Sequence, residues 1–239
     1  MTATTLSGFK DDRYYLRYKL ERDPFPGTQD DIVYLTPQIN HRVEQVREAI
    51  AGNHKVIVVT SSPGAGKSVL AEYLESVPEI SWKISLVQAK ATMSSESLAF
   101  SIISKALPNK ADKPALAIPM LHKYLELSSR ADFVPVFIVD DADKLSLETL
   151  KFLFELATLR YAEARFRIVL FADESLNGRL DDPALDNLAA GMVFSLHLPS
   201  LSREQTREYI DTRLNAGEDQ SGRPRDHADR ARTGGTTEK

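Results

Sequence analysis

Residues 56–68 of the chain read VIVVTSSPGAGKS, and this stretch decides the fold. Its opening run, Val56–Thr60, is made of β-branched residues without polar alternation, which predicts a strand buried on both faces of a parallel sheet. A glycine-containing turn follows, and residues 67–77 then have the pattern of an amphipathic helix. A buried strand, a glycine turn and a helix in this order indicate a parallel α/β sheet.

The turn also follows the pattern of a phosphate-binding P-loop. In that pattern a glycine and four further residues precede Gly-Lys-Ser or Gly-Lys-Thr, between a strand and a helix. Gly66, Lys67 and Ser68 match, while Ser61 stands where the first glycine is usual. We expect Ser61 to make the turn out of the strand at a modest cost and with slightly altered geometry. The alternative is a glycine-rich connection without a ligand.

The loop predicts a site for ATP and Mg²⁺. The helix after it would present unpaired N–H groups and the positive end of its dipole to the phosphates. Lys67 is expected to contact the β- and γ-phosphates, and the Ser68 hydroxyl to ligate Mg²⁺. The predicted nucleotide-binding residues are Ser62, Pro63, Gly64, Ala65, Gly66, Lys67, Ser68 and Val69.

Another continuous apolar run, at residues 134–139, predicts a buried strand that ends in Asp140 and Asp141. A carboxylate at a strand end beside the P-loop can hold Mg²⁺, so Asp140 is the second predicted metal ligand. Asp141 stands where a glutamate usually orients or activates the attacking water, and its side chain is shorter than that of glutamate. Hydrolysis is therefore expected to be slow. An acidic helix cap after a core strand is the alternative interpretation of this segment.

A further acidic residue, Asp173, follows the predicted strand at residues 166–171. A polar residue there reaches the γ-phosphate or the lytic water in many P-loop ATPases. An anionic side chain would be repelled by the phosphate unless Mg²⁺ or Lys67 intervenes. The predicted catalytic residues are therefore Lys67, Asp141 and Asp173. The alternative role of Asp173 is the N-cap of a helix over residues 175–180.

Strands alternate with helices along most of the chain. Residues 82–86 and 193–198 also have strand patterns, and helices are predicted in the intervening segments. The predicted fold class is α/β, a three-layer P-loop NTPase fold with a mostly parallel five-stranded sheet. The predicted domains are an N-terminal segment at 1–36, the ATPase core at 37–201, one helix at 202–217 and a disordered polar tail at 218–239.

The composition of the 239 residues excludes several classes of function. There is no cysteine, which rules out disulfides, thiol nucleophiles and cysteine-zinc sites. The net charge of −4 does not favour nucleic acid as the main partner, although a local basic patch stays open. The longest apolar runs are too short to span a bilayer and the N-terminus lacks a signal sequence, so a cytoplasmic location is expected.

With these motifs in place, the chain resembles the AAA+-type ATPases of the general secretion pathway ATPase A (ExeA-like) family over roughly residues 20–216. The related DNA-transposition helper ATPases share the same core. Walker A at Pro63–Ser68 is the specific match, and Walker B lies at Val136–Asp141. The other matches agree in order and spacing: Asp23–Pro26, Tyr34–Pro37, Ser146–Leu150, Val169–Phe171, Arg179-Leu180 and Leu198–Leu201.

The resemblance implies ATP-dependent assembly or remodelling of a protein partner, often in envelope machinery and peripheral to the inner membrane, with a homo-oligomer as a further expectation. It also implies an AAA+-like core with a helical lid, here truncated to the helix at 202–217. The chain departs from the family at Ser61, Asp141 and Asp173, where glycine, glutamate and glutamine are usual. Residues 189–192 lack the usual arginine, so a trans-acting arginine is not assigned.

Three functions compete on this sequence. The first is an ATPase switch that controls a protein assembly, and the second is a module that binds ATP without hydrolysing it. The third is a DNA-associated helper ATPase of transposition or replication. Phosphate release separates the first two, and DNA affinity that weakens with salt identifies the third.

Overall fold

A computed structural model describes most of the chain between residues 37 and 217. The described residues are Tyr15, Leu20, 23–25, 37–52, 54–77, Glu79, 81–108, 113–128, 130–131, 133–159, 165–185 and 192–217. The chain divides into two compact units, one formed by Leu35–Leu201 and the other by Met1–Tyr34 together with Ser202–Lys239. The predicted tail at 218–239 lies outside the described residues. The unit Leu35–Leu201 is called the core unit below.

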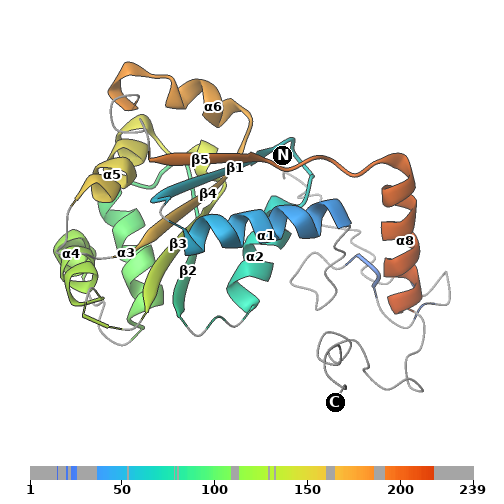
Figure 1. Cartoon of the computed structure of the whole chain (residues 1–239), viewed down its shortest axis with the longest axis horizontal. Helices are drawn as coiled ribbons and strands as arrows, with labels where there is room; N and C mark the ends of the chain where they lie inside the picture. Colours follow the sequence, from blue (N-terminus) through green and yellow to red (C-terminus); the bar gives the residue numbers. More distant parts are fainter. Residues whose placement is uncertain are drawn as a thin grey trace, which may run out of the picture. The chain divides into compact units, whose positions relative to one another are not determined.

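The core unit contains a five-stranded sheet in the order β2-β3-β4-β1-β5, and neighbouring strands run parallel (Figure 1). The predicted parallel α/β sheet is therefore confirmed. β1 lies between β4 and β5, with Val59 opposite Phe171 and Leu196. The strands are β1 (Val56–Ser61), β2 (Trp82–Gln88), β3 (Val134–Asp140), β4 (Arg167–Asp173) and β5 (Val193–His197).

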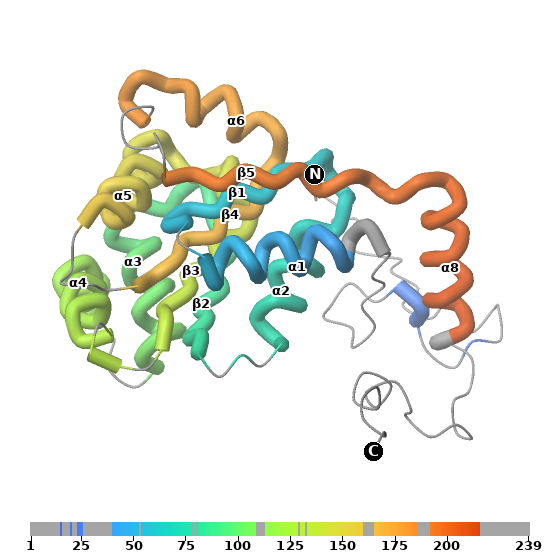
Figure 2. The backbone as a smooth tube through the Cα atoms, viewed as in Figure 1, coloured from blue at the N-terminus to red at the C-terminus, as the bar shows by residue number. Residues whose placement is uncertain are grey.

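Helices cover both faces of the sheet, which gives the predicted three layers (Figure 2). Ile57 and Val59 of β1 pack in one buried cluster with residues of α1 and α2. Val56 and Val58 point to the other face and pack with residues of α3, α4 and α5. The helices are α1 (Pro37–Ala51), α2 (Lys67–Ser76), α3 (Ser95–Ala106), α4 (Ala117–Ser128), α5 (Leu147–Thr158) and α6 (Ser175–Leu180).

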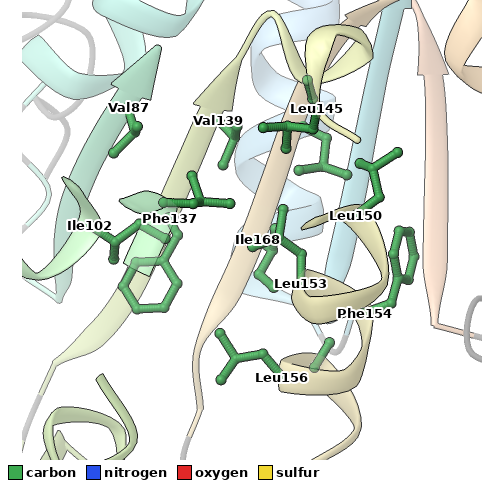
Figure 3. Packing of buried hydrophobic residues seen from close by; sticks show 14 of the residues in the cluster. Val87, Ile102, Phe137, Val139, Leu145, Leu150, Leu153, Phe154, Leu156 and Ile168 are labelled. Atoms are coloured by element: carbon green, nitrogen blue, oxygen red, sulfur yellow. The ribbon is translucent and has the colours of Figure 1, made fainter. Parts of the chain in front are cut away.

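The face covered by α5 is tightly filled with apolar side chains. Figure 3 shows Leu150, Leu153 and Phe154 of α5 lying against the sheet beside Ile168 of β4. All four side chains are at most 1% exposed. Burying such residues stabilises a fold by about 1.5–3 kcal/mol per side chain, so this layer holds β3 and β4 in place beneath the site.

Two helices of the core unit begin with a serine cap. Ser94 accepts a hydrogen bond from Ser97 N at the start of α3, and Ser146 accepts one from Thr149 N at the start of α5. α2 differs, because its N-cap is Gly66 and no side chain caps its first turn. The N–H groups in the first turn of α2 therefore do not donate to an N-cap side chain.

The other compact unit contains α8 (Arg203–Gly217). Ser202 and Gln205 form a reciprocal capping box at its start, with N–H to side-chain oxygen distances of 2.8 and 3.2 Å. Phe25 and Tyr209 have ring centroids 6.1 Å apart in the same unit. The assignment of residues 202–217 to a truncated lid stays a prediction. Among the helices that the structure describes, none has the length and apolar character needed to cross a membrane.

Candidate functional site

The glycine loop lies at the carboxyl end of β1, directly before α2. Gly64 and Gly66 have φ values of 80° and 89°, in the left-handed region that side chains rarely adopt. A Cβ atom at either position would meet nothing within 4 Å, so the backbone angle, and not crowding, requires glycine at both positions. The two positive φ angles turn the chain from the strand into the uncapped start of α2. Pro63 and Val69 of the predicted loop are exposed, and Ala65 N donates to Ser62 O at 3.3 Å.

Ser61 does not make the turn that the sequence predicted for it. It is the last residue of β1, pairs in register with Asp173 of β4 and is fully buried. Among the described residues, Asp141 is the only non-glycine residue with a positive φ. Ser61 therefore has an ordinary backbone conformation. The turn begins after Ser61, and serine in place of glycine therefore carries no backbone strain at this position.

Lys67, the first residue of α2, folds back along its own loop. Its ammonium group donates to Ser61 O at 3.2 Å, to Ser61 Oγ at 3.1 Å and to Ser62 O at 3.2 Å. A fourth bond, to Asp173 Oδ1, is 2.6 Å long and is an ion pair. Lys67 is 8% exposed, so its charge lies in a partly dry position between β1 and β4.

The two predicted metal ligands lie together. Asp140 ends β3 at 5% exposure, and the Ser68 side chain lies close enough to its carboxylate to affect the pKa of Asp140. Burial raises the pKa of Asp140, the nearby Ser68 hydroxyl lowers it and the nearby charge of Asp141 raises it again. A hydroxyl and a carboxylate are hard oxygen donors of the kind that Mg²⁺ prefers. This donor pair fits a magnesium ion, and within the described residues no cluster of three acidic, histidine or cysteine side chains offers another metal site.

Asp141 contacts the end of β2 and the turn after β3. It has φ 57° and ψ 35°, and its Oδ2 accepts bonds from Lys144 Nζ at 2.7 Å and from Gln88 Nε2 at 3.3 Å. The bond to Asp141 raises the pKa of Lys144. Gln88 is the residue of β2 in register with Asp140. Neither Lys144 nor Gln88 was predicted from the sequence, because their contact with Asp141 depends on the register of β2 and β3 and on the turn after β3.

Asp173 is not the helix cap that was its alternative role. The N-cap of α6 is Glu174, and no side chain caps that helix. Asp173 instead pairs with Lys67, while its N–H donates to Asp143 Oδ1 at 3.0 Å. The next residue, Glu174, accepts a bond from Ser62 Oγ at 3.3 Å. Both carboxylates at the end of β4 thus contact the glycine loop.

The predicted site residues therefore gather at one edge of the sheet. β1 supplies the loop and Lys67 follows it, β3 supplies Asp140 and Asp141, and β4 supplies Asp173. The carboxyl ends of parallel strands are the usual ligand position in open α/β sheets. The arrangement can bind an anion through backbone N–H groups and hold a divalent cation beside it.

Similar structures support the same fold. The Aeropyrum pernix ORC2 protein, solved as ADPNP–ADP complexes, has a TM-score of 0.58 and 15% identity, covering 77% of this chain and 54% of that one. Cdc6p from Pyrobaculum aerophilum has a TM-score of 0.61 and 14% identity, with 81% of this chain and 52% of that chain covered. Drosophila ORC bound to DNA has a TM-score of 0.55 and 16% identity, with 90% of this chain and 54% of that chain covered. The chain thus spans about half the length of each of these chains.

No curated protein matches the chain in sequence. One family model does match, over residues 50–180, and it is described as an AAA domain. The matched range contains the glycine loop, both acidic strand ends and α6, and it is more than half of the 239 residues. The chain belongs to the AAA domain family.

Proposed function

We propose that the core unit binds ATP with Mg²⁺ and acts as a nucleotide-dependent switch on a protein assembly. The observation that carries this proposal is the convergence of Lys67, Ser68 and Asp140 beside the uncapped start of α2. The backbone N–H groups of Ser62 and of residues 64–69 would hold the phosphates, since Gly64 and Gly66 allow the backbone to wrap around an anion. Lys67 supplies positive charge to the same phosphates.

Ser68 and Asp140 are the residues that would hold Mg²⁺. Because burial raises the pKa of Asp140, a divalent cation at this position would offset the cost of keeping the carboxylate charged. Two protein ligands leave the remaining positions to water and to phosphate oxygens, which is how magnesium is commonly held in nucleotide sites. When bound, the ion neutralises charge on the phosphates.

Asp141 is the residue that we assign to the activation of water in a slow ATP hydrolysis. Its carboxylate is engaged by Lys144 and Gln88, and its side chain is shorter than glutamate. Both features favour a low rate. The alternative, a module that binds ATP and does not hydrolyse it, is favoured by the same two contacts. Single-turnover phosphate release above the Lys67→Ala background supports hydrolysis, and release at that background supports the binding module.

The test of nucleotide binding is calorimetric titration of the whole chain with ATP and Mg²⁺. We expect Lys67→Ala to weaken binding at least tenfold, because the ammonium group no longer contacts the phosphates. Lys151→Ala is the matched control, since Lys151 is an exposed lysine on α5 whose partner is Glu155. Equal affinity of the wild type and Lys67→Ala, or no binding by the wild type, would refute the proposal.

We propose that the assembly is ExeA-like, and this part of the proposal rests on the sequence motifs that resemble that family. In this proposal the protein is cytoplasmic and forms a homo-oligomer, and its partner lies at the inner membrane. Light scattering after gel filtration, with ADP and with a non-hydrolysable ATP analogue, measures whether the nucleotide changes the size of the assembly. A mass that is the same with both nucleotides, alone and with a candidate partner, would contradict the switch.

A DNA-associated helper ATPase is the second candidate function. Its support is that Drosophila ORC bound to DNA and an Aeropyrum pernix ORC1 protein in complex with DNA share the fold. The net charge of −4 does not by itself exclude DNA, because a local basic surface is sufficient for contact with phosphates. Fluorescence anisotropy with labelled duplex DNA tests this candidate. Binding that weakens steeply with salt supports it, and no binding at low salt removes it.

A further inference from the structure

The ammonium group of Lys67 has an internal carboxylate partner. Of its four acceptors, three are neutral oxygens of Ser61 and Ser62, and the fourth is Asp173 Oδ1 at 2.6 Å. The ion pair is built into the sheet, because Ser61 and Asp173 are register partners in the parallel pair β1 and β4. The lysine that is available for phosphate is therefore already neutralised by a residue of the neighbouring strand.

The backbone holds Asp173 in this position independently of its side chain. Its N–H donates to Asp143 Oδ1 at 3.0 Å, which ties the end of β4 to the turn after β3. Its side chain is 38% exposed and that of Lys67 is 9% exposed, so the carboxylate lies on the open side of the pair. An anion that approaches Lys67 from solvent thus meets the negative charge of Asp173.

We propose that Asp173 makes the site selective for nucleoside diphosphates over nucleoside triphosphates. This inference rests on the proposed nucleotide binding at residues 62–69. A triphosphate brings a further negative phosphate to Lys67, where it must displace Asp173 or tolerate its repulsion. A diphosphate carries less charge, and Lys67 can contact its terminal phosphate while it stays paired with Asp173. ADP is therefore the favoured ligand of the isolated protein.

Glu174 provides the matched control for this inference. It is the next residue, it is also a carboxylate and it also contacts the loop, but its partner is the Ser62 hydroxyl. If the charge beside Lys67 is the cause, removing the charge of Glu174 has a much smaller effect than removing that of Asp173. Substitution of Asp173 by asparagine leaves the backbone bond to Asp143 in place, so the end of β4 keeps its tether.

The experiment is calorimetric titration with ADP and with a non-hydrolysable ATP analogue, both with Mg²⁺, on the whole chain. The wild type is expected to bind ADP more tightly than the analogue. Asp173→Asn should shift the ratio of the two dissociation constants about tenfold toward the triphosphate, since one charge next to the terminal phosphate is removed. Asp173→Glu keeps the charge and Glu174→Gln keeps Asp173, so both should leave the ratio within about twofold.

The outcomes separate this inference from the proposed function. If no nucleotide binds, both fail. If nucleotides bind through Lys67 but Asp173→Asn leaves the ratio unchanged, only the selectivity is wrong. A shift with Asp173→Glu as large as that with Asp173→Asn would show that charge is not the cause, and it also overturns the inference. Unfolding curves without nucleotide confirm that each variant is folded.

Discussion

Arg179 holds the backbone carbonyl oxygen of Asp143, with 2.7 Å between Nη1 and that oxygen, while a second bond joins Nη2 to Leu145 O at 2.6 Å. Arg179 belongs to α6 and Asp143 to the turn after β3. The side chain of Asp143 in turn accepts the N–H of Asp173. One arginine thus links the segments that follow β3 and β4, and both segments carry residues of the candidate site.

Arg179→Met is expected to destabilise the protein by about 2 kcal/mol, because two carbonyl oxygens lose a charged donor. Urea unfolding followed by circular dichroism measures the loss. Arg165→Met is the control, since Arg165 is exposed and should change the free energy of unfolding by less than about 0.5 kcal/mol. Equal effects of the two substitutions would contradict the linking role.

Gly66→Ala is expected to cost about 1–2 kcal/mol, because its φ of 89° is unfavourable for a residue with a Cβ atom. The substitution should also lower the affinity for nucleotide, because a changed backbone angle at residue 66 moves the N–H groups of the loop. Gly178→Ala is the control within α6, where no atom lies within 4 Å of the added Cβ. That change should raise stability by up to about 1 kcal/mol. A Gly66→Ala variant as stable as Gly178→Ala would show that the left-handed angle is not required.

Asp140→Asn and Ser68→Ala are both expected to reduce the gain in ATP affinity that Mg²⁺ provides, by about tenfold, because each removes one oxygen ligand. The measurement is the ratio of dissociation constants with Mg²⁺ and with a chelator. Ser76→Ala is the control, since the Ser76 hydroxyl donates to Tyr73 O at the far end of α2. Loss of affinity that is the same with and without Mg²⁺ would speak against a metal role for these side chains.

Asp141→Glu is expected to raise the single-turnover rate of phosphate release. The aspartate carboxylate is held by Lys144, and the longer glutamate side chain can extend beyond this pair toward the attacking water. Asp141→Asn should reduce release to the Lys67→Ala background. Aspartate tolerates the left-handed backbone better than glutamate does, so Asp141→Glu should also lower the unfolding midpoint slightly. Unchanged or slower release by Asp141→Glu would refute this account of Asp141.

Much of the core unit was predictable from local patterns. The run Val56–Thr60 indicated a buried strand, and β1 covers Val56–Ser61 with every residue buried. The acidic ends of β3 and β4 followed from the same reasoning, because a polar residue after an apolar run marks where a strand leaves the core. Ser146, a residue type that is favoured at helix N-caps, is the N-cap of α5.

The contacts across strands were not predictable in the same way. The pair of Lys67 and Asp173 depends on the register of β1 against β4, and no local pattern specifies which residues of two distant strands lie opposite. The prediction that Ser61 makes the turn was wrong for a related reason. Pairing with Asp173 keeps Ser61 extended, so the chain leaves β1 after this residue.

The sheet separates two apolar layers that share no side chains. Leu70, Ala71 and Leu74, which seat α2 and therefore the glycine loop, all belong to the layer that α1 also lines. In the opposite layer, under α3, α4 and α5, apolar substitutions that conserve side-chain volume leave the contacts of that seat unchanged. Variants of this layer that are designed to raise the unfolding temperature can therefore be checked by their nucleotide affinity. An unchanged affinity would indicate that the glycine loop has kept its position.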